Sequence, residues 1–296
     1  MSAKQSRSQP REDMEVFRAL PCEGMAVRDA QDLMAYPFFA LGKSRRVVPI
    51  DFCAGDVAIR VEGMVEHGLA TIWDADVLIW AASQVVEACD ADIRTSRCIA
   101  ATPYEILSFI RRGTSARDYE RLKASLDRLQ STSVVTSIRQ AALRRLHRFS
   151  WINEWRECAD LRGRPLGLEL VLPDWFYAGI VDPSRVLTID ASYFGLTGGI
   201  ERWLYRLVRK HAGRQSEGWR FDFRHLYRKS GSFARFSDFA ADLRRIVDRQ
   251  SLPGYRLSIV HKPFDSETLV FRAVPPAAPK PRTRCATRCA QPGHRT

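Results

Sequence analysis

The sequence predicts an α+β protein of two tandem winged helix-turn-helix domains, one a pseudo-repeat of the other, between disordered termini. Three observations lead to this fold class. Helical periodicity gives way to two-residue periodicity after pairs of closely spaced helices, this order occurs twice, and basic residues gather in two separate blocks. The 296 residues divide into four parts: a flexible N-terminal arm (1–36), a first winged-helix domain (37–160), a second winged-helix domain (161–274), and a disordered basic, Pro-rich tail (275–296).

The overall composition excludes several classes of protein. Hydrophobic residues make up 45% of the chain and aromatic residues 10%, which is enough to bury a core. The stretch Val77–Val86 is too short to span a membrane, and the polar N-terminus lacks the apolar centre of a secretory signal. Seven scattered cysteines, an odd number, fit a reducing compartment better than a disulfide framework. We expect a cytoplasmic protein with no membrane partner.

The positive charge is concentrated in two blocks. Lys and Arg number 46 against 34 Asp and Glu, and the net charge of +12 favours a polyanionic partner. Residues 47–110 have three basic against ten acidic side chains, residues 111–164 have thirteen against six, and residues 202–250 have thirteen against five. Solvated helix faces are the simpler explanation of such runs. Two separate blocks of similar size favour two nucleic-acid-binding modules on one chain.

The first half starts with two short strands and two helices. Asp74 can cap the first helix. Thr102 at the cap position and Pro103 at the first helical position open the second helix, which ends before Gly113. The predicted elements are the strands Arg46–Phe52 and Val57–Val61, and the helices Trp73–Cys89 and Pro103–Ile110.

A third helix, Ala116–Gln130, follows the turn Gly113–Ser115. Its apolar residues form an inner stripe, whereas Arg117, Arg121 and Arg128 lie on the outer face. We interpret Arg128, far along the helix, as a solvated charge. The period then changes to two, and the predicted ribbon consists of the strand Val134–Arg139, the basic connection Gln140–Arg145 and the returning strand Leu146–Glu154. Helix, helix, turn, helix and ribbon is the order of a winged helix-turn-helix, with the ribbon as its wing.

The second half repeats this order as an architecture, since sequence identity between the halves is low. A short helix that Asp222 caps and a turn at Ser230–Ser232 precede the second basic helix. The predicted elements are the strands Leu168–Leu172 and Val186–Ile189, the helices Asp174–Ile180, Gly198–His211, Asp222–Lys229 and Arg235–Gln250, and the ribbon strands Tyr255–His261 and Thr268–Val274.

No motif in the sequence points to catalysis, a cofactor or a metal. Gly42-Lys43 lacks the upstream glycine of a phosphate-binding loop, the six histidines are isolated, and no Gly-x-Ser-x-Gly turn occurs. Cys285, Cys289 and His294 provide three metal ligands without a fourth. We therefore expect a binding protein and not an enzyme, with no cofactor and no metal.

Several long segments resemble one known family. They are VEGMVEHGLATIWDADVLIWAASQVVEA (Val61–Ala88), TPYEILSFIRRGTSARDYERLKASLDRLQST (Thr102–Thr132), HRFSWINEW (His147–Trp155), GRPLGLELVLPDWFYAG (Gly163–Gly179) and LTGGIERWLYRLVRKHAG (Leu196–Gly213). On these segments the chain is similar to the replication initiator protein A family of bacterial plasmids and mobile elements. The resemblance covers about residues 36–274 and leaves out the arm and the tail.

The resemblance implies a Rep-type initiator with two winged-helix domains. Members of that class are expected to bind repeated sites (iterons) in double-stranded DNA at an origin and to help open the adjacent DNA. They are also expected to recruit the host replication initiator and helicase, and commonly to bind their own promoter, often as a homodimer. Such a protein is associated with a plasmid or the nucleoid.

Candidate DNA contacts lie on the turn, the basic helix and the ribbon of each predicted domain. Arginine can bind guanine O6 and N7 with two hydrogen bonds, whereas Lys, Ser and Thr suit phosphate oxygens. The candidates in the first domain are Arg112, Thr114, Ser115, Arg117, Arg121, Lys123, Ser137, Arg139, Arg144 and Arg145. The candidates in the second domain are Lys229, Ser230, Ser232, Arg235, Ser237 and Lys262. Arg244, Arg245 and Arg249 fit contact with DNA or with solvent equally, and Trp151, Trp155, Trp175 and Trp203 fit a core better than a stack of single-stranded bases.

Two other functions use the same features. A transcriptional regulator without an initiation role would need the same winged helices, and a lone palindrome near the coding region would favour it. Direct repeats beside an A·T-rich stretch would favour initiation. A structural or partner-binding module would instead use the acidic stretch Val47–Ile110.

Overall fold

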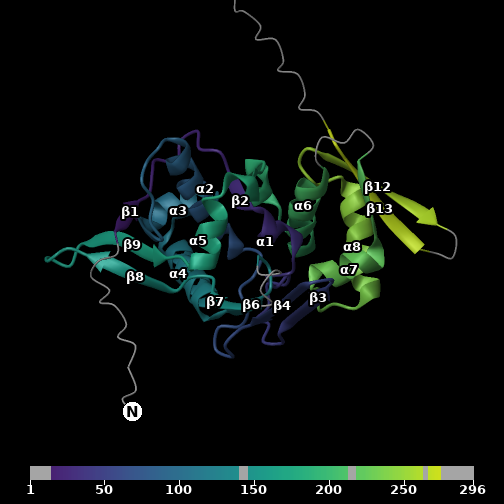
Figure 1. Ribbon diagram of the computed structural model, residues 1–296, viewed down its shortest axis with the longest axis horizontal. Coiled ribbons are helices and arrows are strands. Elements are labelled where there is room, and N and C mark those ends of the chain that lie inside the picture. Colours follow the sequence, from purple (N-terminus) through teal and green to yellow (C-terminus); the bar gives the residue numbers. More distant parts are fainter. Residues whose placement is uncertain (1–14, 140–145, 213–217, 263–265, 275–296) are drawn as a thin grey trace, which may run out of the picture.

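The computed structural model describes residues 15–139, 146–212, 218–262 and 266–274. In this part of the chain helices pack with several small sheets, which confirms the predicted α+β class. The hairpin of β8 (Glu154–Ala159) and β9 (Pro165–Val171) lies at one end of the long axis, and that of β12 (Tyr255–Lys262) and β13 (Ser266–Ala273) at the other (Figure 1). Across the described ranges, no helix is both long enough and apolar enough to cross a membrane.

Three helices of the first half begin and end close to their predicted positions. They are α2 (Ala75–Asp90), α3 (Pro103–Phe109) and α4 (Ala116–Ser131). Thr102 and Ser115 cap α3 and α4 through capping boxes completed by Glu105 and Asp118, so each cap satisfies two backbone N–H groups. The prediction that Asp74 caps α2 was wrong, because its carboxylate accepts hydrogen bonds from Thr71 and Arg128 and none from a backbone N–H of the helix.

One sheet of the first half has the strand order β1-β5-β9-β8. β5 (Cys98–Ala101) lies between α2 and α3 in the chain, and β8 and β9 form a hairpin after α4. β9 pairs antiparallel with both β5 and β8, and β1 (Val16–Arg18) pairs parallel with β5 at the edge. β5, the strand that precedes α3 and α4 in the chain, therefore lies beside β9, the strand that ends the hairpin after them.

The ribbon predicted after α4 belongs to another sheet. β6 (Ser133–Thr136) and β7 (His147–Ser150) pair antiparallel, as predicted, and both are shorter than the predicted strands. β6 also pairs with β4 (Val57–Glu62), and β4 pairs with β3 (Ile50–Ala54), giving the order β3-β4-β6-β7. The connection at residues 140–145 lies outside the described residues.

The second half repeats the order strand, helix, helix, hairpin that β5, α3, α4 and β8–β9 have in the first half. Among its described residues it has no ribbon between its second helix and its hairpin, where the first half has β6 and β7. Its elements are α6 (Gly199–Ala212), β11 (Trp219–Asp222), α7 (Phe223–Ser230), α8 (Phe236–Arg249) and the β12–β13 hairpin. Its sheet order, β11-β13-β12, matches β5-β9-β8 strand for strand. The counterpart of the β12–β13 hairpin in the first half is therefore β8–β9 and not the predicted ribbon. The sequence favours the ribbon as the wing because strand periodicity begins directly after α4. The turn at residues 160–164 resembles, in sequence, a boundary between domains.

Residues 15–36 belong to the folded protein, which differs from the flexible arm predicted for residues 1–36. β1 pairs with β5, and β2 (Arg28–Ala30) pairs with β10 (Val186–Thr188) of the second half. α1 (Gln31–Ala35) follows β2 directly, and its Met34 is fully buried. Residues 1–14 and the predicted tail at 275–296 lie outside the described residues.

The two halves share a core and buried ion pairs. α5 (Asp174–Ile180) and two short 3-10 helices, η3 (Pro183–Arg185) and η4 (Ala191–Gly195), connect the β8–β9 hairpin with α6. One continuous apolar cluster includes residues of both halves, with Trp151, Trp175 and Trp203 buried in it as predicted. Arg206 of α6 pairs with Asp29 of β2, and each side chain is only 1% exposed. The predicted boundary at residue 160 lies in the turn of a hairpin within one sheet, and the division into two separate domains stays a prediction.

Candidate nucleic-acid interface

The turn before α4 and the first two turns of that helix form an exposed basic surface. Arg117 is exposed and forms no ion pair within the described part of the chain. Arg121 has 62% of its side chain exposed and lies 3.1 Å from Asp118, a weak surface pair that a phosphate or a base can replace. Thr114 is also exposed, and the Ser115 hydroxyl is already engaged as the helix cap. These residues remain candidates for DNA contact.

One side of α4 is held against β8. The Lys123 ammonium lies 2.5 Å from Glu157 of β8 and 3.3 Å from Glu120, and these carboxylates raise the pKa of Lys123. The indole N–H of Trp155 donates to Asp127 at 3.1 Å. Lys123, predicted to hold a phosphate, is therefore neutralised by two acids and fixes the helix to the hairpin. Its spacing on the helix flank gave no sign of Glu157, which is on a strand absent from the prediction.

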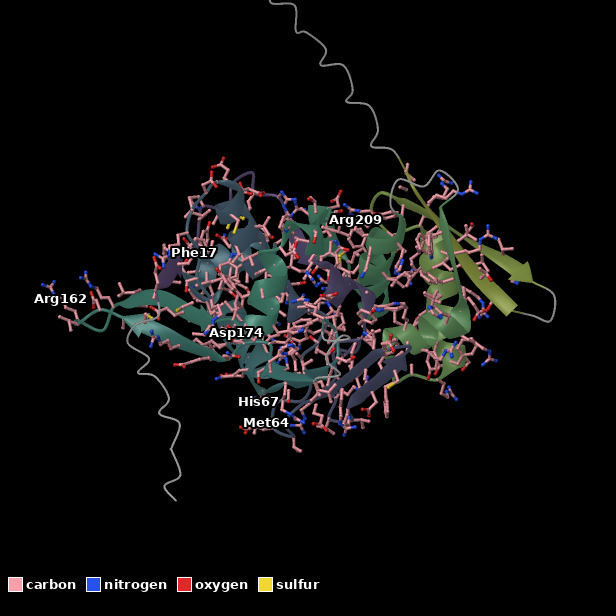
Figure 2. All side chains as sticks on the ribbon, viewed as in Figure 1. Phe17, Met64, His67, Arg162, Asp174 and Arg209 are labelled. Atoms are coloured by element: carbon pink, nitrogen blue, oxygen red, sulfur yellow. The ribbon has the colours of Figure 1, made fainter. Side chains whose placement is uncertain are left out.

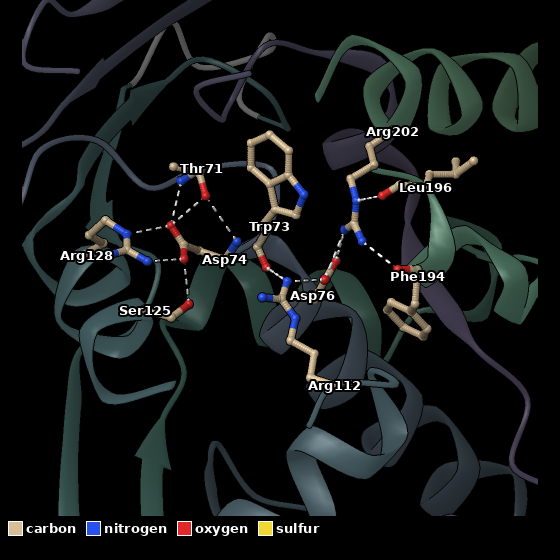
Figure 3. A network of polar contacts seen from close by, with 10 residues as sticks. All are labelled: Thr71, Trp73, Asp74, Asp76, Arg112, Ser125, Arg128, Phe194, Leu196 and Arg202. Atoms are coloured by element: carbon tan, nitrogen blue, oxygen red, sulfur yellow. Dashed lines mark hydrogen bonds and ion pairs between the residues drawn. The ribbon is translucent and has the colours of Figure 1, made fainter. Parts of the chain in front are cut away.

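The other side of α4 is held by the buried carboxylate of Asp74 (Figure 3). Asp74 accepts hydrogen bonds from Arg128 at 2.7 and 2.8 Å and from the Ser125 hydroxyl at 2.6 Å. It also accepts from the backbone N–H of Thr71 at 2.7 Å. The interpretation of Arg128 as a solvated charge was wrong, because this bidentate pair ties the last turns of α4 to the start of α2.

Arg112 is turned inward from the end of α3 toward Asp76 of α2 (Figure 3). Its Nη2 donates to the Asp76 carboxylate at 2.8 Å and to the carbonyl of Trp73 at 3.1 Å. Arg202 of α6 binds the same carboxylate at 2.8 Å, and Asp76 is fully buried. Burial raises the pKa of Asp76, and the two guanidinium groups oppose that rise. The phosphate contact of Arg112 stays a prediction, and in the structure this residue links the first helix pair to the second half.

The ribbon residues selected from the sequence also hold the fold together. Arg139 lies 2.6 Å from Asp32 of α1, donates to the carbonyl of Trp175 at 2.6 Å, and has its guanidinium carbon 4.2 Å from the Trp175 ring centroid. The Ser137 hydroxyl accepts from the backbone N–H of Ala58 and donates to a backbone carbonyl at the β3–β4 turn. Neither residue is placed as a DNA contact. Arg144 and Arg145 lie outside the described residues.

In the second half the start of α8 is exposed, as are Phe233 and Ala234 just before it, whereas Ser230–Ser232 are buried or half-buried. Arg235 has 84% of its side chain exposed and lies 3.0 Å from Asp238, and Ser237 beside it is exposed. These two residues have the same position on α8 as Arg117 and its neighbours have on α4. They remain candidates for DNA contact. The side chain of Lys262, at the end of β12, lies outside what the structure describes.

The turn residues Lys229, Ser230 and Ser232 were predicted to hold phosphates, and in the structure Lys229 is half-buried and Ser230 is fully buried. Lys229 donates to the carbonyl of Ala35 at 2.9 Å, and its burial lowers its pKa to about 8. The fully buried Ser230 hydroxyl donates to the Tyr227 carbonyl and accepts from the backbone N–H of Ser232. The Ser232 hydroxyl accepts from a backbone N–H two residues on, so all three residues shape the turn.

Comparisons with known proteins agree with this arrangement. Residues 28–257 match the family Replication initiator protein A. The chain belongs to this family. A protein of Wigglesworthia glossinidia brevipalpis described as "Putative replication protein" is 30% identical over 229 residues, which are 76% of this chain and 82% of that relative. The resemblance inferred from the sequence is thus confirmed.

Solved structures of another protein share the fold of this family member. Two crystal structures of domains 2 and 3 of RctB superpose with TM-scores of 0.60 and 0.54 at 14% sequence identity. Each covers 82% of this chain, which in turn covers 98% and 95% of those chains. The match spans both halves of the family member, so their arrangement in one chain is a shared feature of the fold.

The β8–β9 hairpin carries two exposed arginines that were not among the candidate DNA contacts predicted from the sequence. Arg162 lies at the outer end of this hairpin (Figure 2). Arg164 has 70% of its side chain exposed and lies 2.8 Å from Asp160, whose carboxylate also accepts the backbone N–H groups that close the turn. The sequence carried a signal for this hairpin, since Asp160 followed by Gly163 is typical of a tight turn between two strands. In the structure Gly163 has the positive φ of 75° that such a turn requires.

Proposed function

We propose that this protein is a sequence-specific, non-enzymatic binder of double-stranded DNA that initiates replication through two winged helix-turn-helix modules. The observation that carries the proposal is the repeated arrangement of strand, helix, turn, helix and hairpin, with sheet orders β5-β9-β8 and β11-β13-β12. In a winged helix the second helix of the pair enters the major groove and the hairpin meets the neighbouring backbone. α4 and α8 are then the recognition helices, and β8–β9 and β12–β13 are the wings.

The exposed cations fit these two roles. The exposure of Arg117 and Arg121 at the start of α4, and of Arg235 at the start of α8, supports contacts of these residues with base edges. Thr114 and Ser237 are placed for phosphate oxygens beside them. Arg162 and Arg164 on the first wing take the place proposed from the sequence for the ribbon. Lys262 has the corresponding place on the second wing.

The partners follow from membership of an initiator family. We expect the protein to bind direct repeats at its origin and its own promoter, to help open the adjacent duplex, and to recruit the host initiator and helicase. The buried ion pairs between the halves favour one rigid body that contacts two stretches of the same duplex. A homodimer on a repeated or palindromic site is compatible with this arrangement, as is a location with the plasmid or nucleoid in the cytoplasm.

The test is autonomous replication. The gene with its flanking DNA is placed on a circle that has no other origin, and bacterial transformants are counted over several generations. Persistence that requires both the gene and direct repeats beside it supports the proposal. Binding to one palindrome and repression of a reporter, without persistence of the circle, would instead assign the protein to transcriptional regulation.

A further inference from the structure

We propose that a basic hollow beside α4 binds a backbone phosphate of the DNA strand on the side of the helix opposite the β8–β9 hairpin. The inference rests on the proposed function and adds a contact surface to it. The hollow has a volume of about 370 Å³ and lies between the segment 43–45, the segment 67–74 and α4. Its cationic lining consists of Lys43, Arg45, Arg112, Arg121 and Arg128.

The cations of the hollow are not equally neutralised. Arg112 and Arg128 are paired with the buried carboxylates of Asp76 and Asp74. Lys43 and Arg45 are exposed, and neither forms an ion pair with any residue that the structure describes. The Lys43 ammonium lies 5.2 Å from the Trp73 ring centroid, and Arg45 donates to the backbone carbonyl of Glu66 at 3.1 Å. Two positive charges are therefore held in place without an anion.

The segment that carries these two residues is fixed by its neighbour, Arg46. The Arg46 guanidinium donates to the carbonyls of Val48 and Pro49 and, at 2.9 Å, to the carbonyl of Gly231 in the turn before α8. Its own carbonyl accepts from the backbone N–H of Leu69 at 2.8 Å. Lys43 and Arg45 thus belong to a segment anchored to both halves, so binding an anion there costs little ordering of the chain.

The position of the hollow matches the geometry of a helix in the major groove. That groove is about 12 Å wide, close to the diameter of a helix with its side chains, so a phosphate ridge lies along each side of an inserted helix. β8 lies along one side of α4 through Lys123 and Trp155. The hollow lies along the other side, where Arg121 and Arg128 line it. With α4 in the groove, one ridge meets the first wing and the other meets Lys43 and Arg45.

The experiment compares two double variants that each remove two positive charges from the first half. Lys43→Gln/Arg45→Gln removes the proposed contacts. Arg60→Gln/Arg94→Gln is the matched control, because both arginines are exposed and already paired with carboxylates. The duplex is the site that the wild-type protein selects from a random-sequence pool. Binding is measured between 50 and 200 mM salt on this site and on unrelated duplex, and thermal unfolding shows that both variants are folded.

We expect the Lys43/Arg45 variant to lose affinity equally for selected and unrelated DNA, and its salt slope to fall by about 0.9, the value for one lost phosphate contact. Its affinity then decreases about 3.5-fold less than that of wild type across this salt range. The control keeps the wild-type slope. A single uncharged methylphosphonate, placed in turn along each strand, should weaken wild type at one position where the variant shows no further loss.

Other results would overturn the inference in distinguishable ways. A variant with the wild-type slope, while Arg121→Ala still loses site discrimination, would leave the proposed function standing and remove the phosphate site. Millimolar inorganic phosphate that stabilises wild type but not the variant, with DNA binding unchanged in both, would make the hollow a site for a free anion. Failure of the wild-type protein to select any site would instead contradict the proposed function itself.

Discussion

The two helix-turn-helix units differ in how their turns are used, although their sheets have the same order. In the first unit the turn before α4 is exposed at Thr114, and the inward residue is Arg112, which reaches Asp76 and through it Arg202 of the other half. In the second unit the end of α7 and the start of the turn are tied to the first half, since Lys229 donates to the Ala35 carbonyl of α1 and the Gly231 carbonyl accepts from Arg46. The beginning of each recognition helix, by contrast, is open in both units.

This difference shows that a basic block is not by itself a DNA footprint. Arg202, Arg206 and Lys229 all belong to the second block of positive charge, yet the first two are buried, Lys229 is half-buried, and all three join the two halves. A buried charge is retained where it is paired and hydrogen-bonded. The cations at the start of α4 and α8, by contrast, are exposed, and the proposed function assigns DNA contact to these and to the exposed cations of the wings.

The largest effect should come from the buried pair between β2 and α6. Asp29→Ala leaves the Arg206 guanidinium buried without its carboxylate, and such a loss costs about 3–5 kcal/mol of folding free energy. Urea unfolding followed by circular dichroism gives this value. One cooperative transition, shifted as a whole, is expected if the halves unfold together. Two separate transitions, with only one shifted, would show that the units are independent.

The next effect concerns the recognition helices. Arg121→Ala and Arg235→Ala should each cost about 1–3 kcal/mol of binding to the selected site, if each arginine contacts a base edge. The two losses should roughly add, since the residues lie in different units and share no partner. Titrations of the single and double variants measure this. Wild-type binding by Arg235→Ala alone would make the second unit a module for a partner or for dimerisation.

Arg112→Ala tests whether a basic residue near the turn of the first unit stabilises the fold or contacts DNA. The position of Arg112 in the sequence predicts a phosphate contact, whereas its ion pair with Asp76 indicates a structural role. We expect the substitution to lower the free energy of unfolding, as it leaves the buried Asp76 with one guanidinium in place of two. Site discrimination of the folded variant should match wild type. A stable variant that binds DNA with a salt slope lower by about one would return Arg112 to the phosphate contacts.

A smaller effect is expected from pH. Burial and the nearby Lys229 and Lys210 lower the pKa of His211 to about 4, so the folded protein keeps this imidazole neutral. The unfolded chain takes up the proton at a pH near 6.5, and stability is therefore lost as the pH falls from 6.5 to 4. Because the ring is only half-buried, we expect about 1–2 kcal/mol. His211→Gln should lose less stability over this range, as chemical denaturation at each pH would show, and an identical profile would contradict the assignment.

The smallest effect distinguishes the role of the β8–β9 hairpin, the proposed wing, from that of the ribbon predicted from the sequence. Arg162→Ala and Arg164→Ala should each reduce the salt slope of DNA binding by about 0.9 and leave thermal stability unchanged. Ser137→Ala should do the reverse, because its hydroxyl satisfies two backbone groups within the fold. Unchanged DNA binding by both arginine variants would remove the β8–β9 hairpin from the interface.

The features that sequence could predict are those with local causes. The caps at Thr102, Ser115 and Asp222 and the apolar stripes of the helices lie within a few residues of what they determine, and the helices follow them closely. The roles of Arg112, Arg139 and Lys229 depend on partners 36, 107 and 194 residues away along the chain. The short strands β1 and β5 likewise form by pairing with segments far away in the sequence, and neither shows a local periodicity from which a strand could be predicted.

The most direct test of the account is a hydroxyl-radical footprint on the selected site, compared between wild type, Arg121→Ala and Arg235→Ala. Two units held as one rigid body predict two protected stretches at a constant separation. Each variant should weaken protection in its own stretch and leave the other in place. A single protected stretch that Arg235→Ala leaves unchanged, or two stretches whose separation varies between sites, would contradict the claim that one rigid chain reads DNA with both recognition helices.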